Sequence, residues 1–378
     1  MLYNPAGLKL ATTKDEIPHP AFFHLNYSLM RVAVGMSGGV DSSVCALLMK
    51  ELAQEVIGVT LRFHQVACST EDLRVCCSPE DVKDAARVSE YLGIPHITLS
   101  WENIFEERVI NYFLKESLSG KTPNPCAVCN REVKTGFLAQ YLRKVADIDK
   151  LATGHYAKFV EYKGKRLIGR ARDIKRDQSY FLSLVKREHL ELLEFPLGDL
   201  TKEEVRRIAK ENGLPVWDKK DSQDVCFLMG KEPGEFIEER TGSKEGYFYF
   251  DGKPVGRHRG FFHYTIGQRK GLGVALGFPV YVCGVDAENN IVYLCKEEDL
   301  YRDWLLLEDI NLHLDLNLWE NPKAQIRYRN EPVVVKDIEK TQEGYIIRFE
   351  KPVRGITPGQ VCAFYESDIL LGGGIIKS

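Results

Sequence analysis

The run Arg31-Val-Ala-Val-Gly-Met-Ser-Gly-Gly-Val-Asp-Ser-Ser43 determines the fold of the first half of the chain. Its first five residues form a short β-branched stretch that ends in glycine, and an apolar stretch at residues 44–52 follows the serines. This order predicts a strand, a tight turn and a helix. The paired glycines let the backbone approach an anion closely, and the serines and the first N–H groups of the helix supply donors. A phosphate or pyrophosphate is therefore the expected ligand.

This glycine turn lacks two common phosphate-binding signatures. It is not a Walker loop, because no Gly-Lys-Ser/Thr follows, and it is not the Gly-x-Gly-x-x-Gly of a dinucleotide fold. The alternative is an ordinary glycine turn with a Ser or Asp N-cap, but the whole run is more specific than a glycine pair. It resembles the PP-loop of the ATP pyrophosphatases, which cleave ATP between the α and β phosphates to adenylate a carbonyl oxygen. Ammonia, an amine or sulfur then displaces AMP, so the loop implies the activation step and leaves the product open.

Strands and helices alternate through the first half of the chain. The expected strands are residues 31–35, 56–61, 94–99 and 150–153, and the expected helices are residues 44–52, 79–92, 104–118 and 132–145. Strands separated by helices of this length predict an α/β domain, built on a Rossmann-like parallel sheet with helices on both faces.

The length of 378 residues predicts two to three domains. Near Gly230 the sequence changes to short alternating runs with glycines, aromatic residues and turn signals, which predicts two small β-rich domains. The expected organisation is an N-terminal extension or misassigned start at 1–30, a PP-loop catalytic domain at 31–228, a central β-rich domain at 229–300 and a C-terminal β-barrel at 301–378.

The composition excludes several classes of protein. Apolar residues make up 44% and charged residues 28%, with no long apolar run, which excludes membrane spans and intrinsic disorder. The 51 Lys and Arg against 54 Asp and Glu give a net charge of -3, so a nucleic-acid surface must be a local basic patch. Ten cysteines in a chain without a secretory leader indicate the reducing cytoplasm, where Cys-x-x-Cys is more often a metal or redox site than a structural disulfide.

Three cysteines are candidates for chemistry. The run Thr122-Pro-Asn-Pro-Cys-Ala-Val-Cys-Asn130 is interpreted as a proline-rich loop that delivers Cys126 and Cys129 just before a helix, a position that favours thiolates. Cys226 follows polar turn residues later in the chain. The alternative for any cysteine is a small buried hydrophobe. We expect that role for Cys45, Cys283, Cys295 and Cys362, and we expect Cys68, Cys76 and Cys77 to be non-catalytic.

Further runs follow in order along nearly the whole chain: Gly120-Lys-Thr-Pro-Asn-Pro125 with Cys129-Asn130, Ala152-Thr-Gly-His-Tyr-Ala157, Asp177-Gln-Ser-Tyr-Phe-Leu182, the Cys226 segment and Tyr264-Thr-Ile-Gly-Gln-Arg-Lys-Gly-Leu-Gly273. Together with the glycine loop, they resemble the tRNA-specific 2-thiouridylases. The resemblance implies ATP- and Mg2+-dependent thiolation of C2 of the wobble uridine, position 34 of tRNA. It also implies a cysteine desulfurase or a sulfur-relay protein as partner, and no membrane.

The resemblance also implies roles for individual residues. ATP is expected to contact Gly35, Met36, Ser37, Gly38, Gly39, Val40, Asp41, Ser42, Leu61 and Gly154. The tRNA is expected to contact Asn124, Pro125 and Cys126 at the target uridine, His155, Arg176, Asp177 and Gln178 near it, and Tyr328, Arg329 and Gln360 in the last domain. Cys129 takes the place of the catalytic nucleophile, and Cys226 that of the persulfide carrier.

Cys126 departs from the family pattern, because many members carry aspartate at this position. Together with Cys129 and Cys226, it could hold three irons of a 4Fe-4S cluster and leave the fourth iron to bind a sulfide. Structural zinc is less favoured because a closed site wants four ligands, although His155 could serve as the fourth. From the sequence we favour the cluster over a persulfide relay, since the third thiol has no evident packing role.

Basic and aromatic residues alternate at 256–264, at 267–271 and at Arg327-Tyr-Arg329, which we expect on a strand. These runs are expected to bind tRNA phosphates, against the alternative of solvated charge clusters. His258 and His263 are expected to be tRNA contacts or packing groups rather than metal ligands. Two other functions stay open: an amidating PP-loop ligase, and a non-catalytic RNA-binding module with a structural metal.

Overall fold

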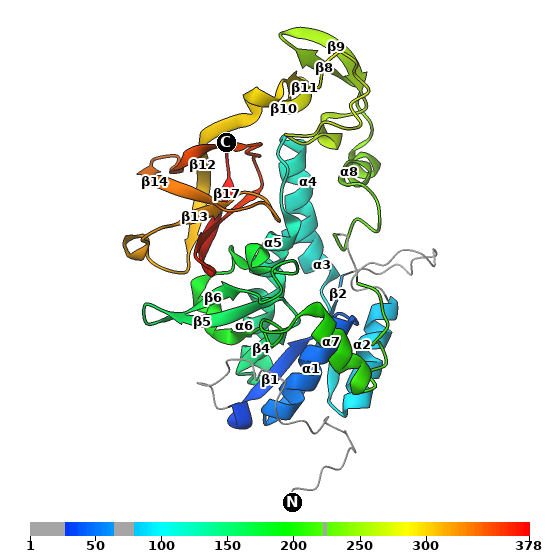
Figure 1. Cartoon of the computed structure of the whole chain (residues 1–378). Helices are drawn as coiled ribbons and strands as arrows, with labels where there is room; N and C mark the ends of the chain where they lie inside the picture. The colour runs from blue at the N-terminus through cyan, green and yellow to red at the C-terminus, as the bar shows by residue number, and fades with distance from the viewer. Residues whose placement is uncertain (1–26, 64–78, 222–224) are drawn as a thin grey trace, which may run out of the picture. The chain divides into compact units, whose positions relative to one another are not determined.

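The expected parallel sheet is present in the first half of the chain (Figure 1). β1 (Arg31–Gly35) lies at its centre, and every neighbouring pair of strands is parallel. On one side of β1 come β2 (Glu55–Arg62) and β3 (His96–Ser100), and on the other side β4 (Lys150–Thr153) and β7 (Leu193–Glu194). The chain passes from β1 to β2 and β3 on one side of the sheet and then crosses to β4 on the other side of β1. Open α/β sheets bind ligands at such a switch point, which here lies between β1 and β4. The prediction of an α/β domain with a parallel sheet is confirmed.

The computed structural model describes residues 27–63, 79–221 and 225–378. The chain divides into two units. The first comprises Met1–Asn103, Lys134–Ser179 and Glu188–Cys226, and the second comprises Ile104–Val133, Tyr180–Arg187 and Phe227–Ser378. Across the described residues, no helix combines the length and the apolar character needed to cross a bilayer.

Helices cover the sheet of the first unit. The core between sheet and helices contains Val32 and Val34 of β1, Val44 and Leu47 of α1, and further apolar residues of α2 and α7. The helices are α1 (Val40–Leu52), α2 (Pro79–Leu92), α6 (Phe137–Ala146) and α7 (Lys202–Glu211), and the hairpin β5 (Ala157–Tyr162) and β6 (Lys165–Arg170) follows β4. α1 begins directly after the glycine turn, as expected.

Two helical regions differ from the sequence prediction. The helix expected at 104–118 begins earlier and is interrupted, with α3 (Glu102–Phe105), a π-helical turn at Glu106–Ile110 and α4 (Asn111–Leu118). The helix expected at 132–145 is α6, which begins later than expected, at Phe137, after α5 (Pro125–Cys129) and a π-helical turn at Asn130–Lys134. Hydrophobic periodicity does not distinguish a π-helical turn from α-helix, so the interruptions carry no sequence signal.

The second unit carries the two β-rich regions. After α8 (Pro233–Thr241), the strands β8 (Gly246–Phe250), β9 (Lys253–His258), β10 (Tyr281–Asp286) and β11 (Ile291–Cys295) form a sheet in the order β10-β11-β8-β9. Its core is built from Phe248, Phe261, Val282 and Val292. The prediction of a small β-rich region here is confirmed.

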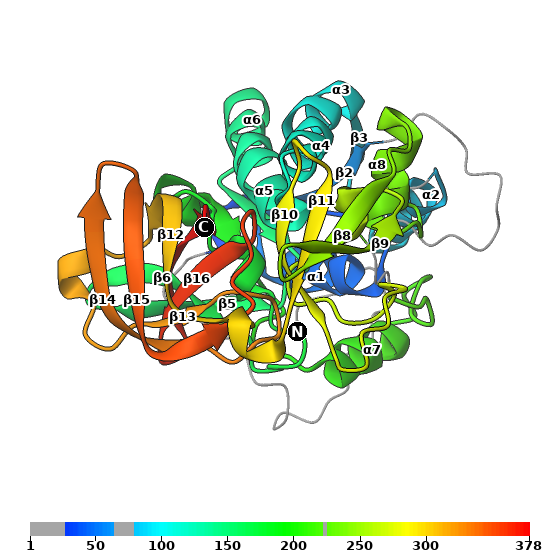
Figure 2. The ribbon, with the colours of Figure 1, turned by 90° about the horizontal axis from the view of Figure 1, so that it is seen from above.

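The last strands close into a barrel, which Figure 2 shows from above. They are β12 (Tyr301–Leu312), β13 (Lys323–Gln325), β14 (Val333–Thr341), β15 (Gly344–Arg354), β16 (Val361–Glu366) and β17 (Ile369–Ile376). Neighbours follow in the order β12-β15-β14-β13-β16-β17, and β12 pairs again with β17. Closure removes the exposed strand edges. The predicted C-terminal β-barrel is therefore confirmed.

Candidate active site

Serine hydroxyl groups form hydrogen bonds that join the glycine loop, residues 37–43, to the first turn of α1. The backbone N–H of Ser37 donates to Ser42 Oγ at 3.1 Å, and the hydroxyls of Ser42 and Ser43 donate to the carbonyl of Gly39 at 3.1 Å and 2.8 Å. Gly39 is the N-cap of α1 and supplies no side-chain acceptor to its first turn. A helix start of this kind, next to a glycine turn, is suited to a phosphate group.

Two glycines are required by the geometry of this loop. Gly38 has a φ of +69°, and a Cβ atom there would lie 2.2 Å from the carbonyl oxygen of Asp81. At Gly154, just after β4, a Cβ atom would lie 2.9 Å from both the carbonyl carbon of Asp41 and the nitrogen of Ser42. The ends of β1 and β4 therefore approach the start of α1 closely, which brings Gly154 beside the loop.

The remaining predicted ATP residues lie at the end of β1, at the start of α1 and near the end of β2, all in the first unit. Gly35 ends β1, and a Cβ atom there would meet Thr153 Cγ2 at 3.6 Å. Met36, Val40 and Leu61 are buried, and the backbone N–H of Met36 donates to the carbonyl of Val59 at 2.8 Å. Met36 and Val40 belong to the hydrophobic core of the first unit, which anchors both ends of the loop.

Asp41 is held by two residues that the sequence analysis did not identify. Lys202 Nζ lies 2.7 Å and 2.8 Å from its two carboxylate oxygens, and the hydroxyl of Tyr156 donates to Asp41 Oδ1 at 2.9 Å. Burial, reinforced by the charge of Asp41, raises the pKa of Tyr156, so the phenol keeps its proton. Asp41 is thus fixed at the second position of α1 by a cation and a hydroxyl.

The residues after β4 make mainly internal contacts. The carboxylate of Asp177 is 4% exposed and accepts from the backbone N–H groups of Ala171 at 3.0 Å and Ser179 at 3.2 Å, and from the Ser179 hydroxyl at 2.8 Å. Gln178 Oε1 accepts from the N–H of Tyr156 at 2.9 Å. Both side chains therefore shape this region, and their contact with tRNA stays a prediction.

His155 and Arg176 lie in the same region. Burial, with a smaller contribution from the charge of Lys134, lowers the pKa of His155 to about 3, so its ring is neutral near pH 7. Nδ1 of His155 lies 2.8 Å from Thr153 Oγ1. Arg176 pairs with Asp221 at 3.0 Å and is about half exposed. Arg176 therefore keeps donors available at the surface.

Cys126 and Cys129 lie on a short helix rather than in the expected loop. Asn124 is the N-cap of α5, and its Oδ1 accepts from the N–H of Ala127 at 3.1 Å. Pro125 occupies the first turn, where proline starts a helix readily. Cys129 is buried and Cys126 is partly exposed. Residues three apart in a helix share a face, so the two thiols project from the same side of α5.

The segment that leads into α5 is held by distant parts of the second unit. The N–H of Thr122 donates to the carbonyl of Pro358 at 2.8 Å, and Gln360 Nε2 donates to the carbonyl of Thr122 at 2.8 Å. A Cβ atom at Gly359 would lie 2.9 Å from the carbonyl carbon of Thr122. Gln360, predicted as a tRNA contact, is therefore also a positioning residue for the cysteine helix, which we define as Asn124–Asn130.

Tyr328 and Arg329 lie in a turn after β13, so the prediction of a strand for Arg327-Tyr-Arg329 is wrong. Arg329 has a φ of +67°, which a strand does not allow, and its guanidinium lies 5.3 Å from the centre of the Tyr328 ring. Tyr328 packs against Phe181 with ring centroids 4.5 Å apart. Arg327 is turned inward and donates to the carbonyl of Ile266 at 2.6 Å, which leaves Arg329 as the exposed cation of the run.

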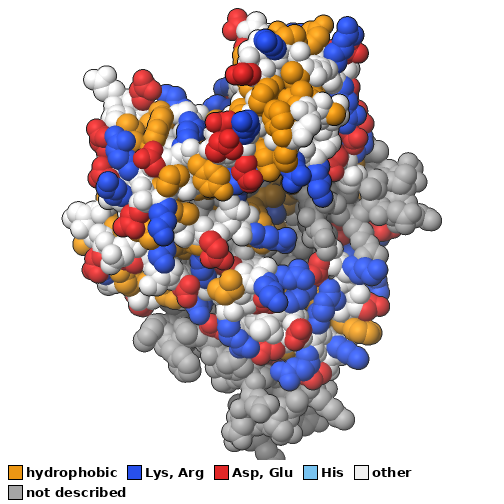
Figure 3. Space-filling model, turned by 45° about the horizontal axis from the view of Figure 1, so that its top comes forward, with side chains coloured by type: hydrophobic (Ala, Val, Ile, Leu, Met, Phe, Trp, Pro, Cys, Tyr) orange, Lys and Arg blue, Asp and Glu red, His pale blue; other side chains and the backbone are white. Residues whose placement is uncertain are grey.

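The basic run at 256–264 divides into exposed arginines and internal histidines. Arg257 and Arg259 are exposed, whereas His258 packs between Phe248 and Tyr264 at centroid distances of 5.0 Å and 5.4 Å. On the face that Figure 3 shows, Lys and Arg side chains are interspersed with Asp and Glu. His258 therefore acts as a packing group, one of the two roles expected for it.

Family models match three consecutive parts of the chain. They are described as the tRNA methyl transferase HUP domain at residues 30–230, the tRNA methyl transferase PRC-barrel domain at 234–296 and the aminomethyltransferase beta-barrel domain at 302–376. Among curated relatives, the tRNA-specific 2-thiouridylase MnmA of Aquifex aeolicus (strain VF5) is 62% identical over 352 residues, which covers 92% of this chain and 99% of that protein. The chain belongs to the tRNA-specific 2-thiouridylase family.

Further members of the 2-thiouridylase family match over the same extent. Those of Persephonella marina (strain DSM 14350 / EX-H1) and Hydrogenobaculum sp. (strain Y04AAS1) are 52% and 50% identical, and each match covers 92% of this chain and 100% of the relative. A solved 4-thiouridine synthetase in complex with RNA and bound ATP aligns with a TM-score of 0.35 and 15% identity over 56% of this chain and 50% of that one. A likeness this distant carries no argument about the site.

The three candidate thiols of this 2-thiouridylase are divided between the units. Cys126 and Cys129 belong to the second unit, and Cys226 is the last residue of the first. Among its described residues, neither unit contains a group of three or more His, Cys, Asp or Glu side chains that could hold a metal ion. The predicted three-thiolate site is therefore not built within either unit.

The other cysteines mostly follow the expectation of small buried hydrophobes. Cys45, Cys295 and Cys362 are buried, and burial raises the pKa of the Cys45 and Cys362 thiols, which makes them poor nucleophiles. Cys283 is only partly buried. The predictions for Cys68, Cys76 and Cys77 fall outside the described residues.

Proposed function

We propose that this chain is an ATP-dependent tRNA-uridine 2-sulfurtransferase that thiolates C2 of the wobble uridine, position 34. The observation that carries the proposal is the glycine loop at the switch point of a parallel sheet, in a chain that belongs to the 2-thiouridylase family. The curated relatives are named tRNA-specific 2-thiouridylases. An amidating ligase is disfavoured, because amidation gives no role to the Cys126 and Cys129 pair.

In this proposal the loop binds the phosphates of ATP. The expected contacts run from Gly35 to Ser42, with Leu61 beside the adenine and Gly154 beside the loop. Mg2+ is usually bound through substrate phosphates with one or two carboxylates, so in this proposal it would arrive with ATP. The loop N–H groups would stabilise the charge that develops on pyrophosphate when the uridine O2 attacks the α-phosphate. The product of this step is an O-adenylated uridine.

The target uridine would leave its stack before this attack. Flipping a base costs roughly a few kcal/mol and costs least in a single-stranded loop such as an anticodon. We propose contacts from Asn124, Pro125 and Cys126. Because Asn124 Oδ1 is used for the N-cap, its Nδ2 group is the part that can donate to a base carbonyl.

The sulfur step is proposed as a persulfide relay between Cys226 and Cys129. Attack of the Cys129 thiolate on the Cys226 sulfur breaks the persulfide bond, forms a Cys129–Cys226 disulfide and releases hydrosulfide. Hydrosulfide adds to the adenylated C2, and AMP leaves with the original oxygen. An external thiol then reduces the disulfide, and a cysteine desulfurase or relay protein reloads Cys226. A 4Fe-4S cluster held by Cys126, Cys129 and Cys226 stays the alternative, and no step is derived through it.

The tRNA would be bound by His155, Arg176, Asp177 and Gln178 near the reacting base, and by Tyr328, Arg329 and Gln360 on the barrel. Exposed arginines are suited to phosphate contacts, which position a tRNA without reading its sequence. The division at 31–228, 229–300 and 301–378 is proposed as the functional one, with ATP chemistry in the first part and tRNA contacts in the other two. Because the relay needs reduced thiols, we also propose a cytoplasmic location.

Protein purified without oxygen tests this function directly. Wild-type protein with ATP, Mg2+, tRNA and a persulfide donor should release pyrophosphate only when tRNA is present, and mass spectrometry should find 2-thiouridine. Asp41→Ala or Ser42→Ala should abolish pyrophosphate release while tRNA affinity stays unchanged. Wild-type pyrophosphate release in either variant would overturn the role of the loop.

Cys126 distinguishes the two sulfur chemistries. In a relay, Cys126→Asp keeps substantial activity, whereas Cys129→Ser and Cys226→Ser lose thiolation. In a cluster, loss of any one of the three thiols removes iron and thiolation together, and air inactivates the wild type. Iron content and the absorbance spectrum of the anaerobic protein should show no stoichiometric iron if the relay operates.

A further inference from the structure

Asp41 places a negative charge at the end of α1 that a phosphate group would use. It is the second residue of α1, directly after Val40, where the positive end of the helix dipole stabilises a carboxylate. The same dipole and the N–H groups of the same turn attract an external anion to the glycine loop. A carboxylate and a polyphosphate at this helix end therefore repel each other unless a cation balances the carboxylate.

Lys202 supplies that cation. Its Nζ lies 2.7 Å from Asp41 Oδ1 and 2.8 Å from Oδ2, and its side chain is only 10% exposed. Of the residues that the structure describes, no other Lys or Arg forms an ion pair with Asp41. The hydroxyl of Tyr156, which also donates to Asp41, is neutral and does not balance its charge. Because water screens a buried group little, the ammonium acts strongly on Asp41 and on any charge close to it.

The charge of Lys202 is not cancelled by its second carboxylate partner, Asp221, which lies 2.7 Å from Nζ. Asp221 also pairs with Arg206 at 2.8 Å and with Arg176 at 3.0 Å. Together with Asp41, these groups are three cations and two carboxylates, so the cluster has a net charge of +1. Without Lys202 the net charge falls to zero, and Asp41 is left without its cation.

Lys219 also contacts the glycine loop, but its charge is balanced. Its Nζ donates to the carbonyl of Gly38 at 3.1 Å and pairs with Asp81 at 2.7 Å and Asp84 at 2.6 Å. Arg87 in turn pairs with Asp84 at 3.2 Å. These two cations and two carboxylates form a neutral group. Of the two lysines, only Lys202 therefore belongs to a cluster with net positive charge.

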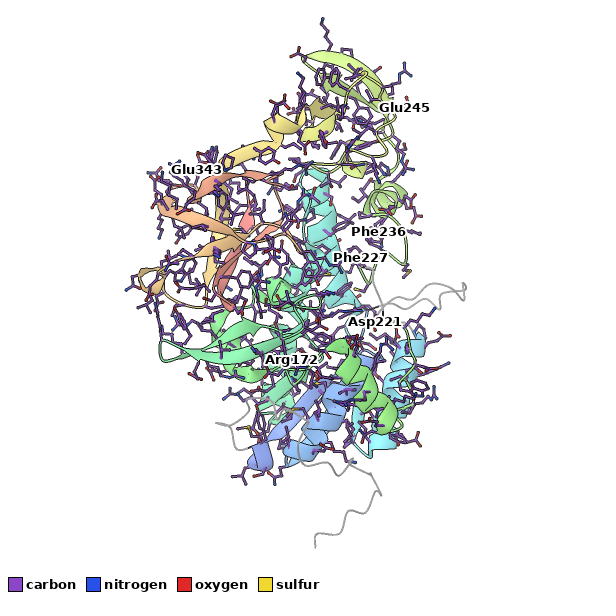
Figure 4. All side chains as sticks on the ribbon, in the orientation of Figure 1. Arg172, Asp221, Phe227, Phe236, Glu245 and Glu343 are labelled. Atoms are coloured by element: carbon purple, nitrogen blue, oxygen red, sulfur yellow. The ribbon has the colours of Figure 1, made fainter. Side chains whose placement is uncertain are left out.

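Lys202 is the first residue of α7, where the helix dipole disfavours a positive charge. Its backbone N–H donates to Asp173 Oδ2 at 3.1 Å, and Glu204 of the capping box pairs with Arg172 at 2.7 Å (Figure 4, where Arg172 and Asp221 are labelled). These contacts hold the helix start without the Lys202 ammonium. A residue that breaks a local rule and is compensated by tertiary partners is expected at a functional site.

We propose that Lys202 determines the preference of the glycine loop for highly charged ligands, and thus for ATP over AMP. Its ammonium balances Asp41 and attracts the polyphosphate, so the affinity gained from Lys202 grows with the negative charge of the ligand. The triphosphate substrate is then bound more tightly than the monophosphate that remains after the reaction. Lys202 is a specificity-determining residue in this account, which rests on the proposed binding of ATP to the loop.

Ligands of graded charge test this role in the full chain. Equilibrium dialysis measures the affinities for adenosine, AMP and α,β-methylene-ATP, which cannot be cleaved between the α and β phosphates. The buffer is metal-free, so that no bound cation changes the charge of a ligand. Because Coulomb energy is proportional to ligand charge, and the analogue carries about twice the charge of AMP, Lys202→Met should weaken AMP about fivefold and the analogue about 25-fold. The affinity for uncharged adenosine should not change.

Further variants separate the charge of Lys202 from its packing. Lys202→Arg keeps the cation and should recover most of the affinity for the analogue. The matched control is Lys210→Met, which removes an exposed lysine from the same helix and should leave all three affinities unchanged. If Lys202→Met folds poorly, Asp41→Asn carries the test, because it removes the opposing charge and keeps an acceptor for the Tyr156 hydroxyl. It should tighten binding of the analogue more than binding of AMP.

Two results would overturn the role of Lys202. One is an equal loss of affinity for adenosine, AMP and the analogue in Lys202→Met, which a purely structural lysine would give. The other is an unchanged affinity for the analogue in both Lys202→Met and Asp41→Asn. If the wild type binds no nucleotide, with or without Mg2+, and thiolates no tRNA, the proposed function itself fails. If it thiolates tRNA while the losses do not grow with ligand charge, only the role of Lys202 fails.

Discussion

The glycine loop of the first unit and the cysteine helix of the second are held in place by different kinds of contact. The hydrogen bonds that shape the turn of the loop join residues no more than five apart, such as Ser37 to Ser42 and Ser43 to Gly39. The carboxylate of Asp41 is the exception, because it binds Lys202 and Tyr156 from distant parts of the chain. The turn is encoded in a short window of sequence. The turn was therefore predictable from that window, whereas the two distant partners of Asp41 were not.

The cysteine helix depends instead on residues far away in the chain. Pro358 and Gln360 bind Thr122 across 236 and 238 positions, and Asn130 Nδ2 donates to the carbonyl of Phe181 at 3.1 Å. No short window of sequence contains these partners. The comparison indicates that substitutions in the loop act locally on ATP chemistry, whereas substitutions in the barrel reach the cysteine thiols.

Gly38→Ala tests the local contacts of the glycine loop and should have the largest effect of the variants considered. The added Cβ would overlap the Asp81 carbonyl in a left-handed backbone, so the loop donors are displaced. Pyrophosphate release should fall by about 100-fold or more, the usual cost of losing preorganised donors. Gly252→Ala is the matched control, because Gly252 also has a positive φ of +74° but open space around it. Release within twofold of wild type in Gly38→Ala would refute the account of the loop.

Gly359→Ala tests the long-range contacts that hold the cysteine helix. Its Cβ would press on the carbonyl carbon of Thr122 and shift the segment that leads into the cysteine helix. Thiolation should fall by about 10- to 100-fold, since displacement of reacting groups by an ångström costs that much. Nucleotide affinity should stay at the wild-type value. The control is Gly355→Ala in the same barrel, where φ is +69° and nothing lies within 4 Å. Equal thiolation by the two variants would contradict the positioning role of the barrel.

Elements with local signals were predicted well. The helix expected at 79–92 is present as Pro79–Leu92, and the strand expected at 150–153 is present as Lys150–Thr153. Periodicity and flanking turn residues fix such elements within a few positions. The prediction of a strand at Arg327-Tyr-Arg329 was wrong. Its alternating residue types resemble a strand, but the backbone at Arg329 is left-handed.

The functional residues that were missed share one property. Lys202 and Asp41 are 161 positions apart, and Tyr156 and Asp41 are 115 apart. A lysine at the start of a helix carries no signal of its partner, and a dipole argument would even disfavour it. Such contacts are created by the sheet order, which brings the ends of β1 and β4 together, so a single sequence does not reveal them.

Arg329→Ala should have a moderate effect, on tRNA affinity alone. Arg329 is exposed on a turn of the barrel, so its loss should remove about one phosphate contact and lower the salt dependence of binding by about one unit of slope. Arg348→Ala removes another exposed cation of the barrel and serves as the control. A filter-binding titration with unchanged affinity and slope in Arg329→Ala would exclude the residue from the tRNA interface.

His155→Gln should have the smallest effect. We expect it to change how the stability of the fold depends on pH. The pKa of His155 is about 3 in the folded chain, below the value of about 6.5 in the unfolded chain, so the unfolded state binds the extra proton between these values. Stability from the neutral ring is complete above about pH 6.5 and declines as the pH falls toward 3. Denaturation by urea at pH 7 and about pH 4.5 should show a smaller decline in His155→Gln. An equal decline in stability in the wild type and in His155→Gln would show that the His155 ring is exposed to solvent.

The ratio of pyrophosphate to 2-thiouridine tests the central claim most directly, because it joins the glycine loop to the cysteine thiols in one number. The anaerobic wild-type chain is given ATP, Mg2+, tRNA and a persulfide donor, and both products are measured in the same reaction. The account predicts one pyrophosphate for each thiolated wobble uridine, and neither product without tRNA. Pyrophosphate released without tRNA, or tRNA that gains no sulfur while ATP is cleaved, would contradict it.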